Sequence, residues 1–156
     1  MKRIQLFLLF LFMAIHYSSY GQISDSFSDG DFAENPLWQG DEDRFIVNEA
    51  KQLQLSANQT AGIAHLSTDS EVILNAEWSF YVKLEFNPSS NNYIDIYLVS
   101  DQPVLTNPVN GYFVRVGGTQ DEISLYRQSK ENPNSVKLID GLDDRVDHSP
   151  VELRIK

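Results

Sequence analysis

Two tyrosines flank one carboxylate on one face of a predicted strand. The segment Tyr93–Ser100 reads Tyr-Ile-Asp-Ile-Tyr-Leu-Val-Ser and alternates with period two, so Tyr93, Asp95 and Tyr97 share a face. The opposite face is aliphatic and is expected to point into the core: Ile94, Ile96 and Leu98. Flat rings beside an acceptor can hold a sugar, because the rings cover its apolar C–H face while the acid accepts hydrogen bonds from its hydroxyls. Tyrosine is also frequent in strands for its propensity alone.

The neighbouring predicted strands extend this face if all of them present the same side. Their outward residues then form one candidate carbohydrate-binding floor: Tyr81, Lys83, Glu85, Tyr93, Asp95, Tyr97, Arg115, Tyr126 and Gln128. Rings would stack on sugars while Asp95, Arg115 and Gln128 form hydrogen bonds. The alternative is a face whose tyrosines reflect strand propensity and whose charges form cross-strand pairs, such as Asp95 with Arg115. Both interpretations stay open at the level of sequence.

Acidic residues gather in two parts of the chain, at 25–43 and at 140–147. Calcium takes about six to eight oxygen ligands, often carboxylates of loops, so the candidates for a calcium site are Asp29, Asp31, Asp143 and Asp144. The spaced loop Asp-x-Asp-x-Asp-Gly is absent, and solvated acidic loops are therefore the favoured interpretation. No cofactor besides this possible calcium ion is expected, because cysteine is absent and the three histidines are scattered.

The elements that must position these residues are strands. Short alternating runs, separated by Asn, Pro, Gly, Ser and Asp, predict an all-β domain of about nine or ten strands. The favoured architecture is a two-sheet antiparallel β-sandwich of jelly-roll type, with a barrel as the alternative. Besides Tyr93–Ser100, strands are predicted at 45–47, 52–56, 62–67, 78–86, 112–116 after Gly111, 123–128, 136–139 and 151–155. We expect a hairpin between 78–86 and 93–100, and a turn over 129–135.

The N-terminus has the pattern of a secretory signal peptide. Lys2 and Arg3 precede an apolar run at 4–15, and Ser19 and Gly21 suit a cleavage site, so we predict a signal peptide at 1–21 and one domain at 22–156. The apolar run is shorter than the roughly 20 residues that a membrane span needs. The mature chain is therefore expected to be secreted or at the cell surface, without a membrane span.

The net charge limits the classes of partner, and the cysteine content limits how the domain can be stabilised. The formal net charge is -10 and no basic cluster is present, which argues against nucleic acid and anionic membranes as partners. With no cysteine, an exported domain of this size cannot use disulfides and must be stabilised by its core.

Several segments together resemble a family of secreted bacterial modules. They are Asp29-Gly30-Asp31-Phe32, Asn35-Pro36-Leu37-Trp38, Phe45-Ile46-Val47-Asn48, Leu53-Gln54-Leu55, Trp78-Ser79-Phe80-Tyr81-Val82, Phe86-Asn87-Pro88-Ser89, Asn110-Gly111-Tyr112-Phe113 and Leu125-Tyr126-Arg127-Gln128. The chain is similar to the concanavalin A-like (laminin G-like) jelly-roll domain at the N-terminus of secreted bacterial proteins that carry a lamin-tail domain. The resemblance implies export, a two-sheet sandwich, further domains downstream and no established catalytic set. Because Lys156 follows directly on the predicted strand 151–155, we expect the final strands of the sandwich to be missing.

Concanavalin A-like domains also include laminarinase-type glycoside hydrolases, which carry Glu-x-Asp-x-Glu on a groove-lining strand. Ile94-Asp95-Ile96 resembles the centre of that motif, but tyrosines replace both glutamates, and a retaining enzyme needs two carboxylates about 5–5.5 Å apart. Lyase chemistry would need a base and a cation, for which Tyr112, Tyr126, Arg115 and Lys83 have suitable types. The favoured role is a non-catalytic module of a larger secreted or cell-surface bacterial protein that binds carbohydrate. The alternatives are a structural or adhesive spacer without ligand and a glycoside hydrolase or polysaccharide lyase-like enzyme.

Overall fold

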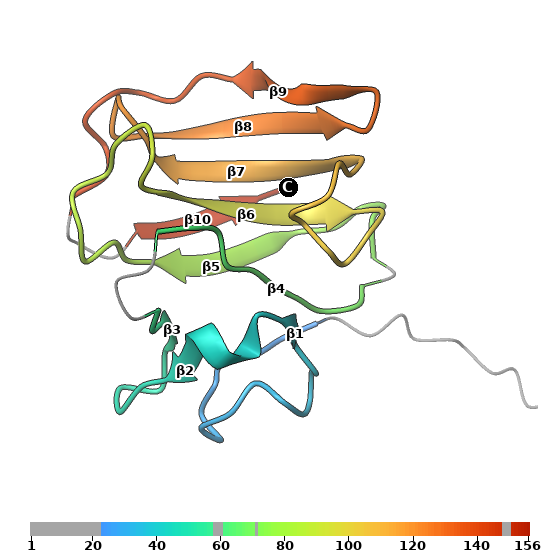
Figure 1. Cartoon of the computed structure of the whole chain (residues 1–156), viewed down its shortest axis with the longest axis vertical. Helices are drawn as coiled ribbons and strands as arrows, with labels where there is room; N and C mark the ends of the chain where they lie inside the picture. Colours follow the sequence, from blue (N-terminus) through green and yellow to red (C-terminus); the bar gives the residue numbers. More distant parts are fainter. Residues whose placement is uncertain (1–22, 58–60, 71, 148–150) are drawn as a thin grey trace, which may run out of the picture.

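The chain folds into antiparallel β-sheets, as Figure 1 shows. The computed structural model describes residues 23–57, 61–70, 72–147 and 151–156. Within them lie three two-stranded sheets, formed by β1 (Gln39–Gly40) with β4 (Leu66–Ser67), β2 (Phe45–Val47) with β3 (Leu53–Leu55), and β5 (Trp78–Val82) with β10 (Val151–Ile155). A short 3-10 helix, η1 (Glu42–Arg44), precedes β2. The fourth sheet has the order β6 (Tyr93–Ser100), β7 (Gly111–Gly117), β8 (Glu122–Ser129) and β9 (Asn132–Ile139).

The prediction of an all-β chain is confirmed, and several antiparallel sheets are consistent with a β-sandwich. The predicted signal peptide at 1–21 lies outside the described residues. The part of the chain that the structure describes contains no long apolar helix of the kind that crosses a membrane.

The four-stranded sheet is a meander with two chemically different faces. Each strand pairs with the next one in the chain, and the register sets Asp95 opposite Arg115 and Tyr97 opposite Phe113. Phe113 in turn lies opposite Tyr126 of β8. Because side chains alternate along a strand, these aromatic and charged residues share one face, which we call the aromatic face.

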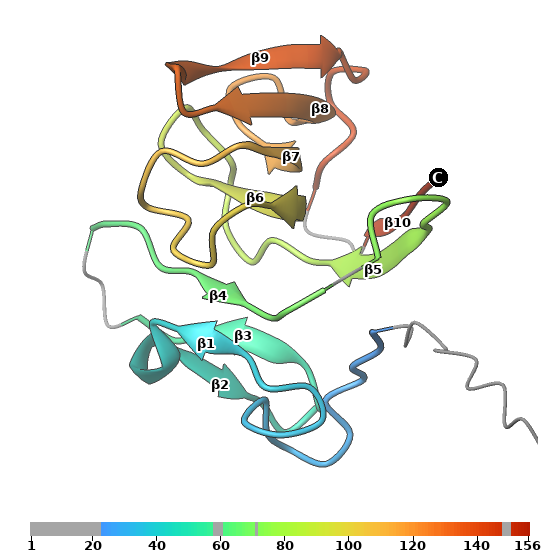
Figure 2. The same ribbon diagram turned by 90° about the vertical axis from the view of Figure 1, so that its right-hand side faces the viewer.

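The other face of this sheet packs against a layer formed by β5, β10 and the segment that follows β5. The buried cluster consists of Val82, Leu84, Val114, Val116 and Val146. Partly buried apolar residues surround it: Phe80, Ile94, Ile96, Leu98, Ile123, Leu125, Leu153 and Ile155. Figure 2 shows β5 and β10 beside the sheet, next to β6. The apolar side of β6 therefore faces the core as predicted, and Tyr93, Asp95 and Tyr97 lie on the aromatic face.

The predicted hairpin between 78–86 and 93–100 is wrong. β5 ends at Val82 and pairs along its length with β10, with Val82 opposite Val151 and Phe80 opposite Leu153. This register places apolar residues of both strands on the core side and polar ones outside, such as Ser79 opposite Arg154. The segment 151–155, expected to have its partner still to come, is therefore paired with β5.

The predicted turn over 129–135 is also wrong, because β9 already begins at Asn132. Arg127 pairs with Val136 and Ser129 with Asn132, so the extra residues form a bulge. β9 lies at the edge of its sheet, where the missing N–H of Pro133 can be tolerated. The predicted strand 62–67 is shorter than expected, since only Leu66–Ser67 pair, with the two residues of β1.

Candidate functional site

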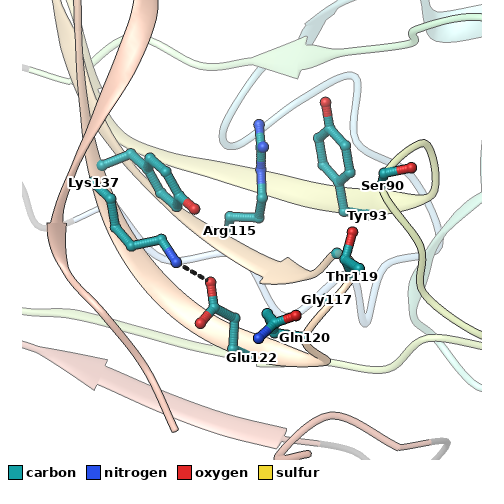
Figure 3. Close-up of a pocket in the computed structure, with 10 residues that line it drawn as sticks. Ser90, Tyr93, Arg115, Gly117, Thr119, Gln120, Glu122 and Lys137 are labelled. Carbon is teal, nitrogen blue, oxygen red and sulfur yellow. Dashed lines mark hydrogen bonds and ion pairs between the residues drawn. The ribbon is translucent and has the colours of Figure 1, made fainter. Parts of the chain in front are cut away.

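A pocket of about 280 Å³ opens on the aromatic face (Figure 3). Its walls come from the start of β6 and the turn before it, from β7 and the loop that follows, and from β8 and β9. The lining residues are Ser90, Tyr93, Arg115, Gly117, Gly118, Thr119, Gln120, Glu122, Tyr126 and Lys137.

Arg115 projects from β7 into this pocket. Its Nε and Nη2 donate to the two carboxylate oxygens of Asp95 at 2.7 and 2.8 Å, a bidentate pair set up by the β6–β7 register. The guanidinium carbon lies 3.8 Å from the centre of the Tyr93 ring and 5.2 Å from that of Tyr126. Burial alone would lower the pKa of Arg115, but the hydrogen bonds and charge of Asp95 outweigh it and raise the pKa. Arg115 is therefore a fixed cation between two aromatic rings.

A second ion pair closes the opposite side of the pocket. Glu122 is only 6% exposed, and Lys137 Nζ donates to its Oε1 at 2.5 Å (Figure 3). The same ammonium group reaches Oδ1 of Asp140, which is exposed. The hydrogen bonds of Asp140 and then of Glu122 raise the pKa of Lys137, so it stays charged at neutral pH. A nearly buried carboxylate needs such a partner, because an unpaired buried charge is strongly destabilising.

The end of the aromatic face beyond Arg115 is filled by stacked rings. Phe113 stacks on Tyr97 with centroids 5.0 Å apart, and on Tyr126 at 5.2 Å with the planes 5° from parallel. Phe113 is therefore only 2% exposed although it points away from the core. The Tyr97 hydroxyl donates to Oε1 of Gln128. Burial, and next the charge of Asp95, raises the pKa of Tyr97, so this hydroxyl remains a donor.

Six of the nine predicted ligand residues share the aromatic face. Tyr93, Arg115 and Tyr126 line the pocket. The other three support their neighbours: Asp95 holds Arg115, and Tyr97 and Gln128 hold each other. Whether any of them contacts a ligand stays a prediction.

Three predicted residues lie elsewhere, so their placement on the common floor was wrong. Tyr81 belongs to β5, alternates with the core residues Phe80 and Val82, and is 73% exposed on the outer side of the second layer. Lys83 and Glu85 follow β5 and form an exposed ion pair of 2.5 Å. The cause is the pairing of β5 with β10 instead of β6.

Sequence reasoning missed the polar residues that complete the pocket: Ser90, Thr119, Gln120, Glu122 and Lys137. Glu122 is in phase with Ser124 and Tyr126 and stands one position before the predicted strand, so a longer strand would have included it. Lys137 lies opposite Tyr126 only because of the bulge in β9, which alternation does not reveal. The loop residues carry no periodic signal.

The calcium candidates lie in turns. Asp29 Oδ1 accepts from the Asp31 N–H, and Asp31 Oδ1 accepts from the N–H groups of Ala33 and Glu34. Asp143 Oδ2 accepts from the Gln120 side chain at 3.2 Å, and the Asp144 N–H donates to the Gln120 carbonyl. Among the described residues, no three Asp, Glu or His side chains are gathered as a metal site, and calcium stays a prediction.

The aromatic face contains two carboxylates, and both are engaged: Glu122 lines the pocket, and Asp95 lies behind the pocket residue Arg115. Asp95 is held by Arg115 and Glu122 by Lys137. Glycoside hydrolysis uses two carboxyl groups that flank the scissile bond, whereas here each of the two carboxylates is paired with a cation. No family model, curated protein or solved structure matches this chain.

Proposed function

We propose that this chain is a non-catalytic carbohydrate-binding module whose pocket beside Arg115 receives a single sugar unit. The observation that carries the proposal is the pocket itself, in which an aromatic wall and polar groups from three strands and two loops converge. Its volume of about 280 Å³ is near the lower limit of ligand pockets, which begin at about 300 Å³. That size suits one sugar ring better than several.

The lining offers what a sugar ring needs. Tyr93 and Tyr126 line the pocket, and the parts of their rings that Arg115 and Phe113 leave uncovered supply apolar surface for C–H groups. Asp95 occupies only Nε and Nη2 of Arg115, and a guanidinium carries five N–H donors, so further donors can bind hydroxyl oxygens. Thr119 and Gln120 on the rim can both donate and accept. A Cβ at Gly118 would meet no atom within 4 Å, so a ligand can approach the backbone there.

The engaged carboxylates favour binding over catalysis. A general acid must hold a proton at working pH and a nucleophile must be free to attack, whereas Asp95 and Glu122 each accept hydrogen bonds from a cation.

The proposal extends to the finer fold and the location of the chain. We assign the sheets to a concanavalin A-like jelly roll, supported by the packing of β5 and β10 against the meander. The signal-like segment 1–21 supports export. Membership of a larger secreted or cell-surface bacterial protein rests on the resemblance of segments such as Asp29-Gly30-Asp31-Phe32.

A spacer without ligand is the second candidate, and a specific observation favours it. Tyr97, Phe113 and Tyr126 stack on one another, and Asp95 satisfies part of Arg115. A face that satisfies its own groups in this way needs no ligand for stability.

A glycan-binding titration with two matched tyrosine variants separates the candidates. Wild type, Tyr93→Ala and Tyr81→Ala are titrated calorimetrically with oligomers of glucose, galactose, mannose and xylose. Tyr93 lines the pocket, whereas Tyr81 is an exposed tyrosine on β5. We expect Tyr93→Ala to weaken binding at least about tenfold, or about 1.4 kcal/mol, and Tyr81→Ala to leave it unchanged. Absence of binding to every oligomer would favour the spacer.

A further inference from the structure

We infer that the pocket selects an uncharged sugar unit over a uronate, a sulfated sugar or an amino sugar. This inference rests on the proposed function, because it names the class of glycan that the same pocket takes. It follows from how the charged groups around the pocket are paired.

Both cations that face the pocket already hold carboxylates. Arg115 gives two nitrogen atoms to Asp95 in a bidentate pair, which is the geometry it would otherwise offer to a ligand carboxylate. Lys137 contacts Glu122 and Asp140 at 2.5 Å each. An anionic sugar would have to displace or share these partners, and displacement would leave Glu122 buried without its cation.

The net charge around the pocket points the same way. The two cations are outnumbered by the three carboxylates that hold them, Asp95, Glu122 and Asp140, in a chain with a formal net charge of -10. An approaching anion is therefore repelled by the local excess and by the whole molecule.

A cationic sugar is disfavoured by the position of Arg115. Its guanidinium covers one face of the Tyr93 ring at 3.8 Å, the place where a ligand cation would otherwise gain from the ring. The net negative charge of the molecule would attract an ammonium group, but inside the pocket that group would meet the like charge of Arg115 beside the ring. Hydroxyl groups meet neither problem, because they can accept from Arg115 and exchange hydrogen bonds with Ser90, Thr119 and Gln120.

Matched pairs of oligomers test the inference on wild-type protein. Glucose, galactose and mannose oligomers are titrated beside glucuronate, galacturonate and mannuronate oligomers of equal length, and beside glucosamine oligomers, at low and physiological salt. We expect at least one neutral oligomer to bind about tenfold more tightly than its charged counterparts. Equal or tighter binding of a charged counterpart would overturn the inference and leave the proposed function intact. Absence of binding to every oligomer would overturn both.

Charge variants test the cause of the selectivity. Asp140→Asn removes one carboxylate from Lys137 at an exposed position, so folding should be preserved, and Glu152→Gln on β10 is the matched control away from the pocket. We expect Asp140→Asn to strengthen uronate binding about threefold at low salt, with the gain lost at high salt and neutral binding unchanged. An equal change for both ligand classes, or an equal gain in Glu152→Gln, would contradict selection by the local charges.

Discussion

Arg115 shows how one residue can be anchored by the fold and still face a ligand. Asp95, on the neighbouring strand, fixes its guanidinium by two hydrogen bonds, and the rings of Tyr93 and Tyr126 lie on either flank. A side chain that is already ordered loses little rotamer entropy when a ligand binds. The same contacts that occupy Arg115 therefore prepare its remaining donors for a hydroxyl group.

Asp101 provides a residue-scale prediction about pH. It accepts from Lys130 at 2.7 Å and from the N–H and side chain of Asn110 at 2.9 Å each, which joins the end of β6 to the β8–β9 turn. These hydrogen bonds, that of Lys130 first, hold the pKa of Asp101 below its ordinary value. A lowered folded-state pKa stabilises the protein above the unfolded value of about 3.9, and this contribution is lost as the pH falls through the folded-state value.

The corresponding variant is Asp101→Asn. At pH 7 wild type should unfold at a higher urea concentration than the variant, and the gap between the two midpoints should shrink as the pH falls below about 4. Urea titrations at pH 7 and at about pH 2.5 measure this gap. A gap of the same size at both pH values would show that the charge of Asp101 contributes nothing.

At the scale of elements, the last residue of β7 and the first residue of the loop after it are two glycines with similar backbones and different surroundings. Gly117 has φ +96° and Gly118 has φ +98°, where residues with a Cβ are strained. A Cβ at Gly117 would lie 2.8 Å from Cβ of Pro88, whereas one at Gly118 would meet no atom within 4 Å.

The pair therefore separates backbone strain from steric overlap. Gly118→Ala should lower the free energy of unfolding by about 1–2 kcal/mol through strain alone. Gly117→Ala should lower it by about 1–3 kcal/mol more, because the Pro88 segment must move. Urea denaturation of both variants gives the difference. Equal losses of unfolding free energy would mean that the Pro88 segment moves aside without an energetic cost.

Local alternation was sufficient to predict β6, β7 and β8, whose partners are adjacent in the chain, although it missed the first four residues of β9. β6 has the predicted bounds, and β7 and β8 each extend one residue beyond the prediction at both ends. The pairing of β5 with β10 could not be predicted in this way, because alternation places side chains on a face without naming a distant partner strand. Because of this error, Tyr81 was predicted to lie on the same sheet as β6.

Site residues whose position follows from the alternation of side chains along a strand were predicted. Site residues whose position depends on the strand register or on a loop were missed. Tyr93, Arg115 and Tyr126 follow from alternation within meander strands. Lys137 depends on the bulge in β9, and Thr119 on the course of a loop, neither of which leaves a periodic trace.

At the scale of the whole molecule, stability depends on a small core beneath part of the meander. The buried cluster draws on β5, the segment after it, β7 and Val146, whereas the edge strand β9 leaves Val136, Leu138 and Ile139 exposed. Burial of apolar area is the main favourable term in folding, so each core position carries a large share of the stability.

Two leucines of opposite exposure test this distribution. Leu84 is 1% exposed and packs in the buried cluster, whereas Leu74 is 80% exposed. Leu84→Ala should lower the free energy of unfolding by about 2–5 kcal/mol, and Leu74→Ala should change it by less than about 0.5 kcal/mol. Thermal and urea unfolding measure both. Comparable losses would indicate that Leu74 is covered in solution.

The pairing of β5 with β10 also determines the order in which the sheets can form during synthesis. The entire meander lies between these two strands in sequence, and each of its strands pairs with the one just made. A chain growing on the ribosome can therefore complete the meander while Phe80 and Val82 still lack their partners opposite, Leu153 and Val151. Until β10 has been synthesised, the apolar edge of β5 stays exposed to water. This is the stage at which a chaperone that binds nascent chains can shield it.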